Sequence, residues 1–234
     1  TEKKLIIQSF FTEGEQLNVW VGYPHDILID TILHEDNAVI ALYKNDVFIE
    51  ELNHIDNGHY SSQVFLESET TYRIEVQAGG LTASAEDVIP KFVSASPLEY
   101  KYILLPDGDE TIRYQFSFQD DVEESNYYEF LLLNAHYREN VDSSYMSLLV
   151  YPKKVDPVLN YEDDSPFNPS SHFFSDELVN GLNYTMSMDM ENMATSRSIK
   201  GKFRNSNNTN YLVFRTISKN YYDFQKSWVK HRYN

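Results

Sequence analysis

The chain has 234 residues, 41% of them hydrophobic, which is enough to form one large β domain or two of ordinary size. Its formal charge of −17, from 36 acidic and 19 basic residues, repels phosphate backbones and anionic lipid headgroups, so nucleic-acid binding is not expected. Cysteine is absent, which excludes disulfides, thiolate nucleophiles and cysteine-bound zinc. No stretch approaches the roughly 20 apolar residues that span a bilayer, and Thr1–Lys4 lacks the apolar core of a signal peptide.

Aromatic residues make up 15% of the chain, with 18 Tyr and 14 Phe. These residue types suit the half-buried surface of a sheet and have only modest helix propensity. An all-β fold is therefore favoured before any motif is considered.

Short runs of alternating apolar residues fill the first part of the chain and are separated by turn residues. Residues 38–43 and 47–52 are joined by Lys44-Asn45-Asp46, in which Asn and Asp tolerate positive φ, and this pattern predicts a hairpin. The predicted strands cover residues 5–11, 17–23, 38–43, 47–52, 60–66, 72–76 and 81–88. About seven short strands are typical of a small β-sandwich.

The segment 90–97 contains two prolines and small polar residues, which indicates a connector between domains. We place the boundary near Ser96, with an N-terminal β-sandwich domain over residues 1–96 and a C-terminal β-rich domain over 97–234. Predicted strands of the second domain cover residues 100–105, 111–118, 127–134, 145–151, 184–190, 199–204 and 211–216. The expected fold is therefore two sandwich-like domains of the immunoglobulin or prealbumin type.

Two segments of the second domain depart from this strand pattern. Residues 155–171 contain three prolines and an acidic triplet without hydrophobic periodicity, which predicts a long loop. Ser218 can cap one short C-terminal helix near 218–232, in which aromatic residues at spacings of three and four share one face. These aromatic residues are Tyr221, Phe224 and Trp228.

The sequence contains no arrangement that defines a catalytic centre. Because no G-x-S-x-G, glycine-rich phosphate loop or H-E-x-x-H pattern occurs, we predict a non-enzyme with no catalytic, cofactor-binding or metal-binding residues. The acidic runs at 120–124 and 162–164 lack the spacing of a calcium loop, so solvated loops are the favoured interpretation. His54 and His59 flank the turn at 56–58, so a metal held across this hairpin stays open as an alternative.

Four aromatic residues in or beside the long loop are predicted partner contacts, because aromatic side chains in a proline-rich loop serve well as interface anchors. They are Tyr161, Phe167, Phe173 and Phe174. Aromatic residues in alternating strands are more often core residues. Exposure of Tyr161, Phe167 or Trp20 would instead favour a carbohydrate- or peptide-binding module.

An ordered series of segments runs through nearly the whole chain and resembles one known family. The segments are KLIIQSF (4–10), NAVIAL (37–42), NGHY (57–60), TYRIEV (71–76), LTASA (81–85), NYY (126–128), FSDELVNG (174–181), VFRTIS (213–218) and YY (221–222). Together they resemble the domain-of-unknown-function 4249 family of Bacteroidota lipoproteins. That family has no established catalytic residues, so none is carried over to this chain.

The resemblance implies an outer-membrane lipoprotein, exposed at the cell surface and attached to the membrane only by a lipidated cysteine outside the given chain. It also implies a TonB-dependent outer-membrane transporter as protein partner, which the chain would assist in cargo capture, covering or assembly. The tripeptide Asp30-Thr31-Ile32 fits the O-glycosylation signal of Bacteroidota and makes Thr31 a candidate site.

Two other functions stay open from the sequence. One is an autonomous carbohydrate- or peptide-binding module. The other is a hydrolase whose two carboxylates meet only in the fold, at a separation of roughly 5 to 10 Å.

Overall fold

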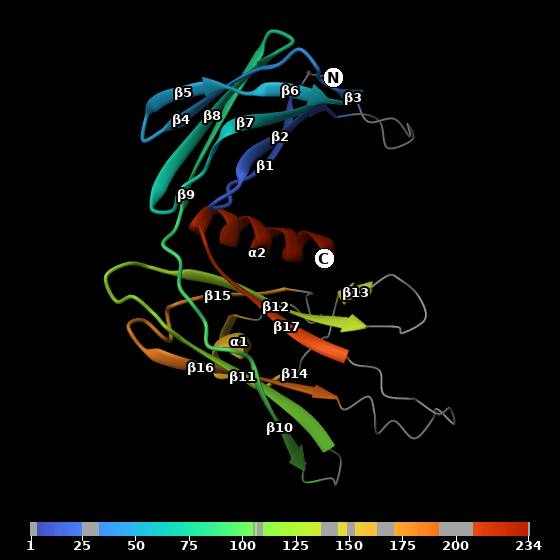
Figure 1. Ribbon diagram of the computed structural model, residues 1–234, viewed down its shortest axis with the longest axis vertical. Coiled ribbons are helices and arrows are strands. Elements are labelled where there is room, and N and C mark those ends of the chain that lie inside the picture. The colour runs from blue at the N-terminus through green and yellow to red at the C-terminus, as the bar shows by residue number, and fades with distance from the viewer. Residues whose placement is uncertain are drawn as a thin grey trace. The chain divides into compact units, whose positions relative to one another are not determined.

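The computed structural model describes residues 4–24, 33–104, 106, 110–136, 145–148, 153–162, 171–191 and 208–233. The chain divides into a first unit, Thr1–Lys91, and a second unit, Phe92–Asn234 (Figure 1). The division lies before the boundary that we expected near Ser96. Val93 is buried in the core of the second unit, and the Ser96 N–H donates to the Ser117 carbonyl oxygen at 2.7 Å. The connector therefore packs as part of the second unit.

The first unit is built from two antiparallel sheets. Its strands are β1 (Ile6–Phe10), β2 (Gln16–Tyr23), β3 (Leu33–His34), β4 (Val39–Lys44), β5 (Val47–Glu51), β6 (Asn53–Asp56), β7 (His59–Phe65), β8 (Thr70–Ala78) and β9 (Leu81–Ile89). The order β1-β2-β7-β6, with β3 beside β2, forms what we call the β2 sheet. The order β5-β4-β8-β9 forms the β8 sheet.

Alternation along the strands builds the core of the first unit. In β2, Leu17, Val19 and Val21 are buried while the residues between them face outward. The same period of two buries alternate residues of β8, so the apolar faces of both sheets contribute to one cluster. Burial of each large aliphatic side chain stabilises the fold by about 1.5–3 kcal/mol.

Two tight turns of the first unit are formed by residues with positive φ. Asn45 and Asp46 have φ values of 48° and 63° in the turn between β4 and β5, which confirms the predicted hairpin. Gly79 and Gly80 join β8 to β9 with φ values of 57° and 79°. The positive φ favours glycine at Gly79, and a Cβ atom there would lie 2.5 Å from the Tyr23 hydroxyl and displace that side chain.

The second unit also contains two antiparallel sheets. Its strands are β10 (Glu99–Leu104), β11 (Glu110–Gln119), β12 (Tyr127–His136), β13 (Tyr145–Leu148), β14 (Lys153–Lys154), β15 (His172–Ser175), β16 (Asn183–Glu191) and β17 (Asn208–Ile217). The β11 sheet has the order β10-β11-β16-β14. In the β12 sheet, β13 and β15 pair with different halves of β12, and β17 also pairs with β12.

Aromatic side chains dominate the core between these two sheets. Phe116 and Phe118 of β11 pack against Tyr128 and Phe130 of β12, with ring centroids 5.5 Å apart for Phe116–Phe130 and 5.0 Å for Phe118–Tyr128. Phe174 of β15 is fully buried in the same cluster. The expected all-β fold of sandwich-like units is confirmed.

A short helix, α1 (Pro157–Glu162), lies within the segment 155–171, which we expected to be a loop throughout. Asp156 caps this helix, because the Val158 N–H donates to Asp156 Oδ1 at 3.0 Å and the intervening proline occupies the first helical position. Val158 and Leu159 are buried in the second core. Six residues are too few for helical periodicity to appear in the sequence, and only the cap signalled the helix.

The predicted C-terminal helix is present as α2 (Lys219–Tyr233). Its N-cap is Ser218, whose Oγ accepts a hydrogen bond from the Tyr221 N–H at 3.1 Å. The packed face differs from the one that the aromatic spacing indicated, since Phe224 and Trp228 are exposed while Tyr221 and Tyr222 are half-buried. The Tyr222 hydroxyl donates to Glu162, so this tyrosine suits the partly polar surface beneath the helix.

Candidate binding surfaces

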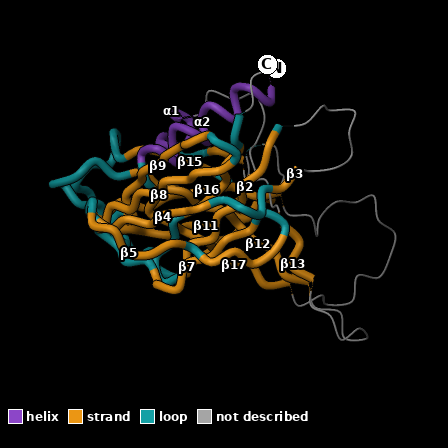
Figure 2. Tube along the Cα trace, turned by 90° about the horizontal axis from the view of Figure 1, so that it is seen from above, coloured by secondary structure: helices purple, strands orange, loops and turns teal. Residues whose placement is uncertain are grey.

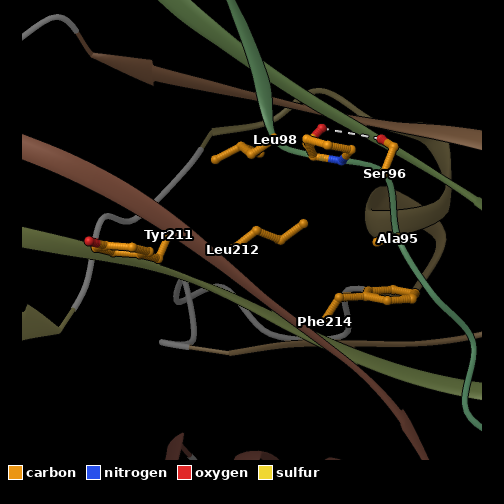
Figure 3. Close-up of a pocket in the computed structure, with 7 residues that line it drawn as sticks. Ala95, Ser96, Leu98, Tyr211, Leu212 and Phe214 are labelled. Atoms are coloured by element: carbon orange, nitrogen blue, oxygen red, sulfur yellow. Dashed lines mark hydrogen bonds between the residues drawn. The ribbon is translucent and has the colours of Figure 1, made fainter.

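An open groove lies at one edge of the second unit (Figure 3). It encloses about 420 Å³ between the connector residues 95–98 and the β17 residues Tyr211, Leu212 and Phe214. Leu98 and Leu212 border the same gap, and Phe214 lies beside Ala95 (Figure 3). None of the described residues that line the groove is acidic or basic, so it suits an apolar side chain of a partner better than a charged substrate.

The groove continues into an exposed row on the edge strand β10. Tyr100, Tyr102 and Leu104 are 64%, 66% and 71% exposed, although they lie on the same face of the sheet as Tyr114 of β11, which is only 6% exposed. Among the described strands β10 pairs with β11 alone. An edge strand with a free apolar row is a template for another polypeptide strand. We call this combined area the edge surface, formed by Leu98, Tyr100, Tyr102, Leu104, Leu212 and Phe214.

A carboxylate at the end of α1, Glu162, accepts hydrogen bonds from β15 and from α2; both helices are drawn in purple in Figure 2. The Ser175 N–H and hydroxyl donate to Oε1 at 2.8 and 2.6 Å, while the Tyr222 hydroxyl and Lys226 Nζ donate to Oε2 at 2.5 and 3.1 Å. Burial alone would raise the pKa of Glu162, but these hydrogen bonds together hold it below its ordinary value. Glu162 therefore anchors α2 as an ionised acceptor.

A second buried acceptor, Asp120, joins the loop after β11 to the loop after β15. The Tyr128 hydroxyl donates to Asp120 Oδ1, and the Gly181 N–H donates to Oδ2 at 2.8 Å. Nearby, Asp176 Oδ2 accepts the Asn126 N–H at 2.7 Å. Burial raises the pKa of Asp176, and the charge of Asp120 raises it further. Both carboxylates are occupied by structural hydrogen bonds rather than presented to a cleft.

The two histidines that flank the turn at 56–58 do not form a metal site. His54 is opposite Tyr60 in the strand register, and its Nε2 lies 3.1 Å from Asp36 Oδ1. His59 lies on the other face of the hairpin, where its ring stacks on Trp20 with centroids 4.7 Å apart. The facing pair that we considered from the sequence is therefore not formed, because neighbouring strand positions alternate between faces.

Of the four predicted contact residues, the structure describes Tyr161, Phe173 and Phe174. Tyr161 is exposed, and its hydroxyl donates to Glu177 Oε1 at 2.9 Å. Phe174 lies in the core and is not available to a partner, because β15 directs alternate side chains to opposite faces. Phe173 points to the other face and is half-buried beside Tyr221, with ring centroids 6.2 Å apart.

Phe167 and the candidate glycosylation residue Thr31 lie outside the described residues. Within the described ranges, no group of three or more His, Asp or Glu side chains is arranged to hold a metal ion. No helix in the same ranges is both long enough and apolar enough to cross a membrane.

Sequence reasoning missed the edge surface even though it predicted the strand that carries it. Alternation identified residues 100–105 as a strand, but the same alternation occurs in buried strands such as β11. The only available signal was the position of this strand directly after the connector, at the start of the second unit. Exposure followed from the edge position in the sheet, which depends on pairing between distant segments.

These features define a class of protein: an all-β chain of two sandwich units, with an apolar edge surface on the second. The model of the domain of unknown function 4249 matches residues 1–232. The chain therefore belongs to this family, as the ordered segments suggested. No curated protein matches the chain.

Proposed function

We propose that the chain is a non-catalytic, surface-exposed outer-membrane lipoprotein that acts as an accessory subunit of a TonB-dependent transporter, in cargo capture, covering or assembly. The edge surface is the observation that carries this proposal, because it fits a protein partner. The lipid anchor and the transporter partner are inferred from what the family resemblance implies.

The exposed row on β10 supports a polypeptide partner. Large apolar side chains on the inner face of a sandwich are normally covered, and a contiguous exposed patch of this kind marks an interaction site. The backbone groups along the outer side of β10 would hydrogen-bond to a partner strand, and the groove beside Leu98 would hold an apolar anchor from the partner.

The distribution of charge also supports contact through the second unit. Residues 1–91 contain 16 acidic and 5 basic residues, whereas residues 92–234 contain 20 acidic and 14 basic residues. The second unit therefore repels an acidic partner less strongly than the first. The only charged side chains in the strand β10 are Glu99 and Lys101, which have opposite signs.

The test is purification of the lipid-anchored protein from native outer membranes under mild detergent, followed by mass spectrometry of what remains bound. We expect a TonB-dependent transporter at a stoichiometric level, and we expect the double variant Tyr100→Ser and Tyr102→Ser to lose it. Phe48→Ser is the matched control, because Phe48 is an exposed aromatic residue on the edge strand β5 of the first unit.

Recovery of the protein alone, in detergents that preserve other transporter complexes, would overturn the proposal. A second variant, Tyr161→Ser, tests the predicted contact beside the long loop. If Tyr161→Ser releases the transporter and the β10 variant does not, the contact lies at α1 and the role of the edge surface is wrong.

An autonomous carbohydrate- or peptide-binding module is the second candidate function. It is favoured by the exposure of Trp20, which is 43% exposed, and of Tyr161. The two candidates differ in what the purified protein does alone: a module of this kind binds its ligand without any transporter present.

A further inference from the structure

Three adjacent strands of the β2 sheet contain no charged residue. Their sequences are IIQSF in β1, QLNVWVGY in β2 and HYSSQVF in β7. The opposite β8 sheet contains Lys44, Arg73 and several acidic residues, and residues 1–91 as a whole carry 16 acidic side chains. A surface of this unit without charge is therefore a local exception in a strongly acidic region.

Most outward side chains of these strands are aromatic rings and amides, and Ile6 and Ser61 lie on the same face. Phe10, Trp20 and Phe65 are exposed aromatic residues on this face. The amides Gln8 and Asn18 alternate with them, since Gln8 is opposite Trp20 and Phe10 is opposite Asn18 in the register. Phe10 and Trp20 are consequently diagonal neighbours, at a distance of about 7–8 Å between backbone positions.

Trp20 is held in one orientation by its neighbours. The His59 ring stacks on the indole with an interplanar angle of 6°, and His59 Nε2 lies 2.8 Å from Asn18 Oδ1. The Asn18 amide in turn donates to the Gln16 carbonyl oxygen at 3.0 Å. An aromatic ring fixed in this way loses little rotamer entropy when a ligand stacks on its remaining surface. Asp56 of β6 lies at the edge of this face, where its Oδ1 atom is 3.9 Å from His59 Nδ1.

We infer that this face binds a neutral oligosaccharide. A sugar ring presents an apolar C–H surface, which stacks on an aromatic ring, and hydroxyl groups, which need partners that both donate and accept hydrogen bonds. Asn and Gln amides do both. Acidic sugars are disfavoured, because the strands offer no Lys or Arg to pair with them and the rest of the unit is negative.

The shape of the face indicates a chain of several sugar rings rather than a single ring. The eight residues of β2 extend roughly 25 Å, and the strands lie about 4.8 Å apart, which makes a long and narrow platform. The inference is independent of the transporter partnership, since the platform lies in the first unit and the edge surface in the second.

The test is native affinity electrophoresis of the intact chain through gels that contain a neutral polysaccharide: a mixed-linkage glucan, a xylan, a galactomannan or starch. Polygalacturonate is the anionic comparator. We expect at least one neutral polysaccharide to slow the chain, and we expect Trp20→Ala to weaken binding about tenfold. Trp228→Ala is the matched control, because Trp228 is the other of the chain's two tryptophans and is also exposed.

Phe10→Ala, on a neighbouring strand, is a second variant that should also weaken binding. It keeps the inference testable if Trp20→Ala does not fold. The inference is overturned if no neutral polysaccharide slows the chain, if only polygalacturonate does, or if both variants migrate like the parent. The Tyr100→Ser and Tyr102→Ser variant should keep sugar binding. Loss of the transporter with sugar binding retained would therefore separate this inference from the proposed function.

Discussion

The two units of this protein bury different kinds of polar side chain. Among the described residues of the first unit, the buried polar side chains are Ser62 and Thr70, which carry no charge. The described residues of the second unit include five buried carboxylates, which are Asp120, Glu129, Asp156, Asp176 and Asp189. In the first unit, short turns connect most of the strands. In the second unit, carboxylates accept hydrogen bonds that hold loops and a helix against the sheets. The stability of the second unit should therefore depend on ionised groups, while that of the first depends on apolar area.

The largest effect is expected from Asp120. Asp120→Ala leaves the Tyr128 hydroxyl and the Gly181 N–H without their acceptor, which should lower the free energy of unfolding of the second unit by about 2–3 kcal/mol. Urea unfolding measures the change, and hydrogen exchange assigns it to a unit. Glu124→Ala is the control, because this exposed side chain lies in the same loop. Equal losses from both substitutions would show that Asp120 does not hold the loop.

A smaller effect is expected from Glu162. Because its pKa lies below the ordinary value of 4.5, its hydrogen bonds contribute fully above that pH and are lost as the pH falls through the lower pKa of the folded protein. We expect Glu162→Gln to cost about 1–2 kcal/mol at neutral pH and to abolish this acid-dependent step.

Fluorescence of single-tryptophan variants between about pH 5 and 3 measures the acid-dependent loss of the Glu162 hydrogen bonds. Trp228 in a Trp20→Phe background should report loosening of α2, while Trp20 in a Trp228→Phe background reports the first unit. Loss of both signals at one pH would contradict the contrast between the two units.

The smallest effect is expected at the outer face of the β8 sheet. Arg73 lies 4.0 Å above the Tyr43 ring and pairs with Glu75, with Asp46 at 3.6 Å and with Glu86 at 3.9 Å. Arg73→Ala should cost only about 0.5–1 kcal/mol, and less at high salt, because these partners are largely exposed to solvent. Urea midpoints at low and high salt test this expectation, and a salt-independent loss above about 2 kcal/mol would show that the cluster acts as part of the core.

Local patterns predicted most strands and the hairpin at Asn45-Asp46, because strand period and turn conformation are set by a few neighbouring residues. They also predicted α2 through its Ser218 cap. They failed at α1, where the Asp156-Pro157 cap was present but the helix was too short to show a period. They failed again at Phe174, whose partners in the core come from β11 and β12 rather than from its own segment.

By itself the sequence determined the all-β class, the two groups of strands and the family, because these depend on alternation, on turn residues and on the order of short segments. Only the tertiary structure decided which alternating strands are covered and which lie at an edge, so that Tyr102 is exposed while Phe116 is buried. It also decided which uncharged strands lie side by side to form the platform around Trp20. The physical reason is that exposure and adjacency depend on pairing between segments far apart in the chain, which local patterns do not encode.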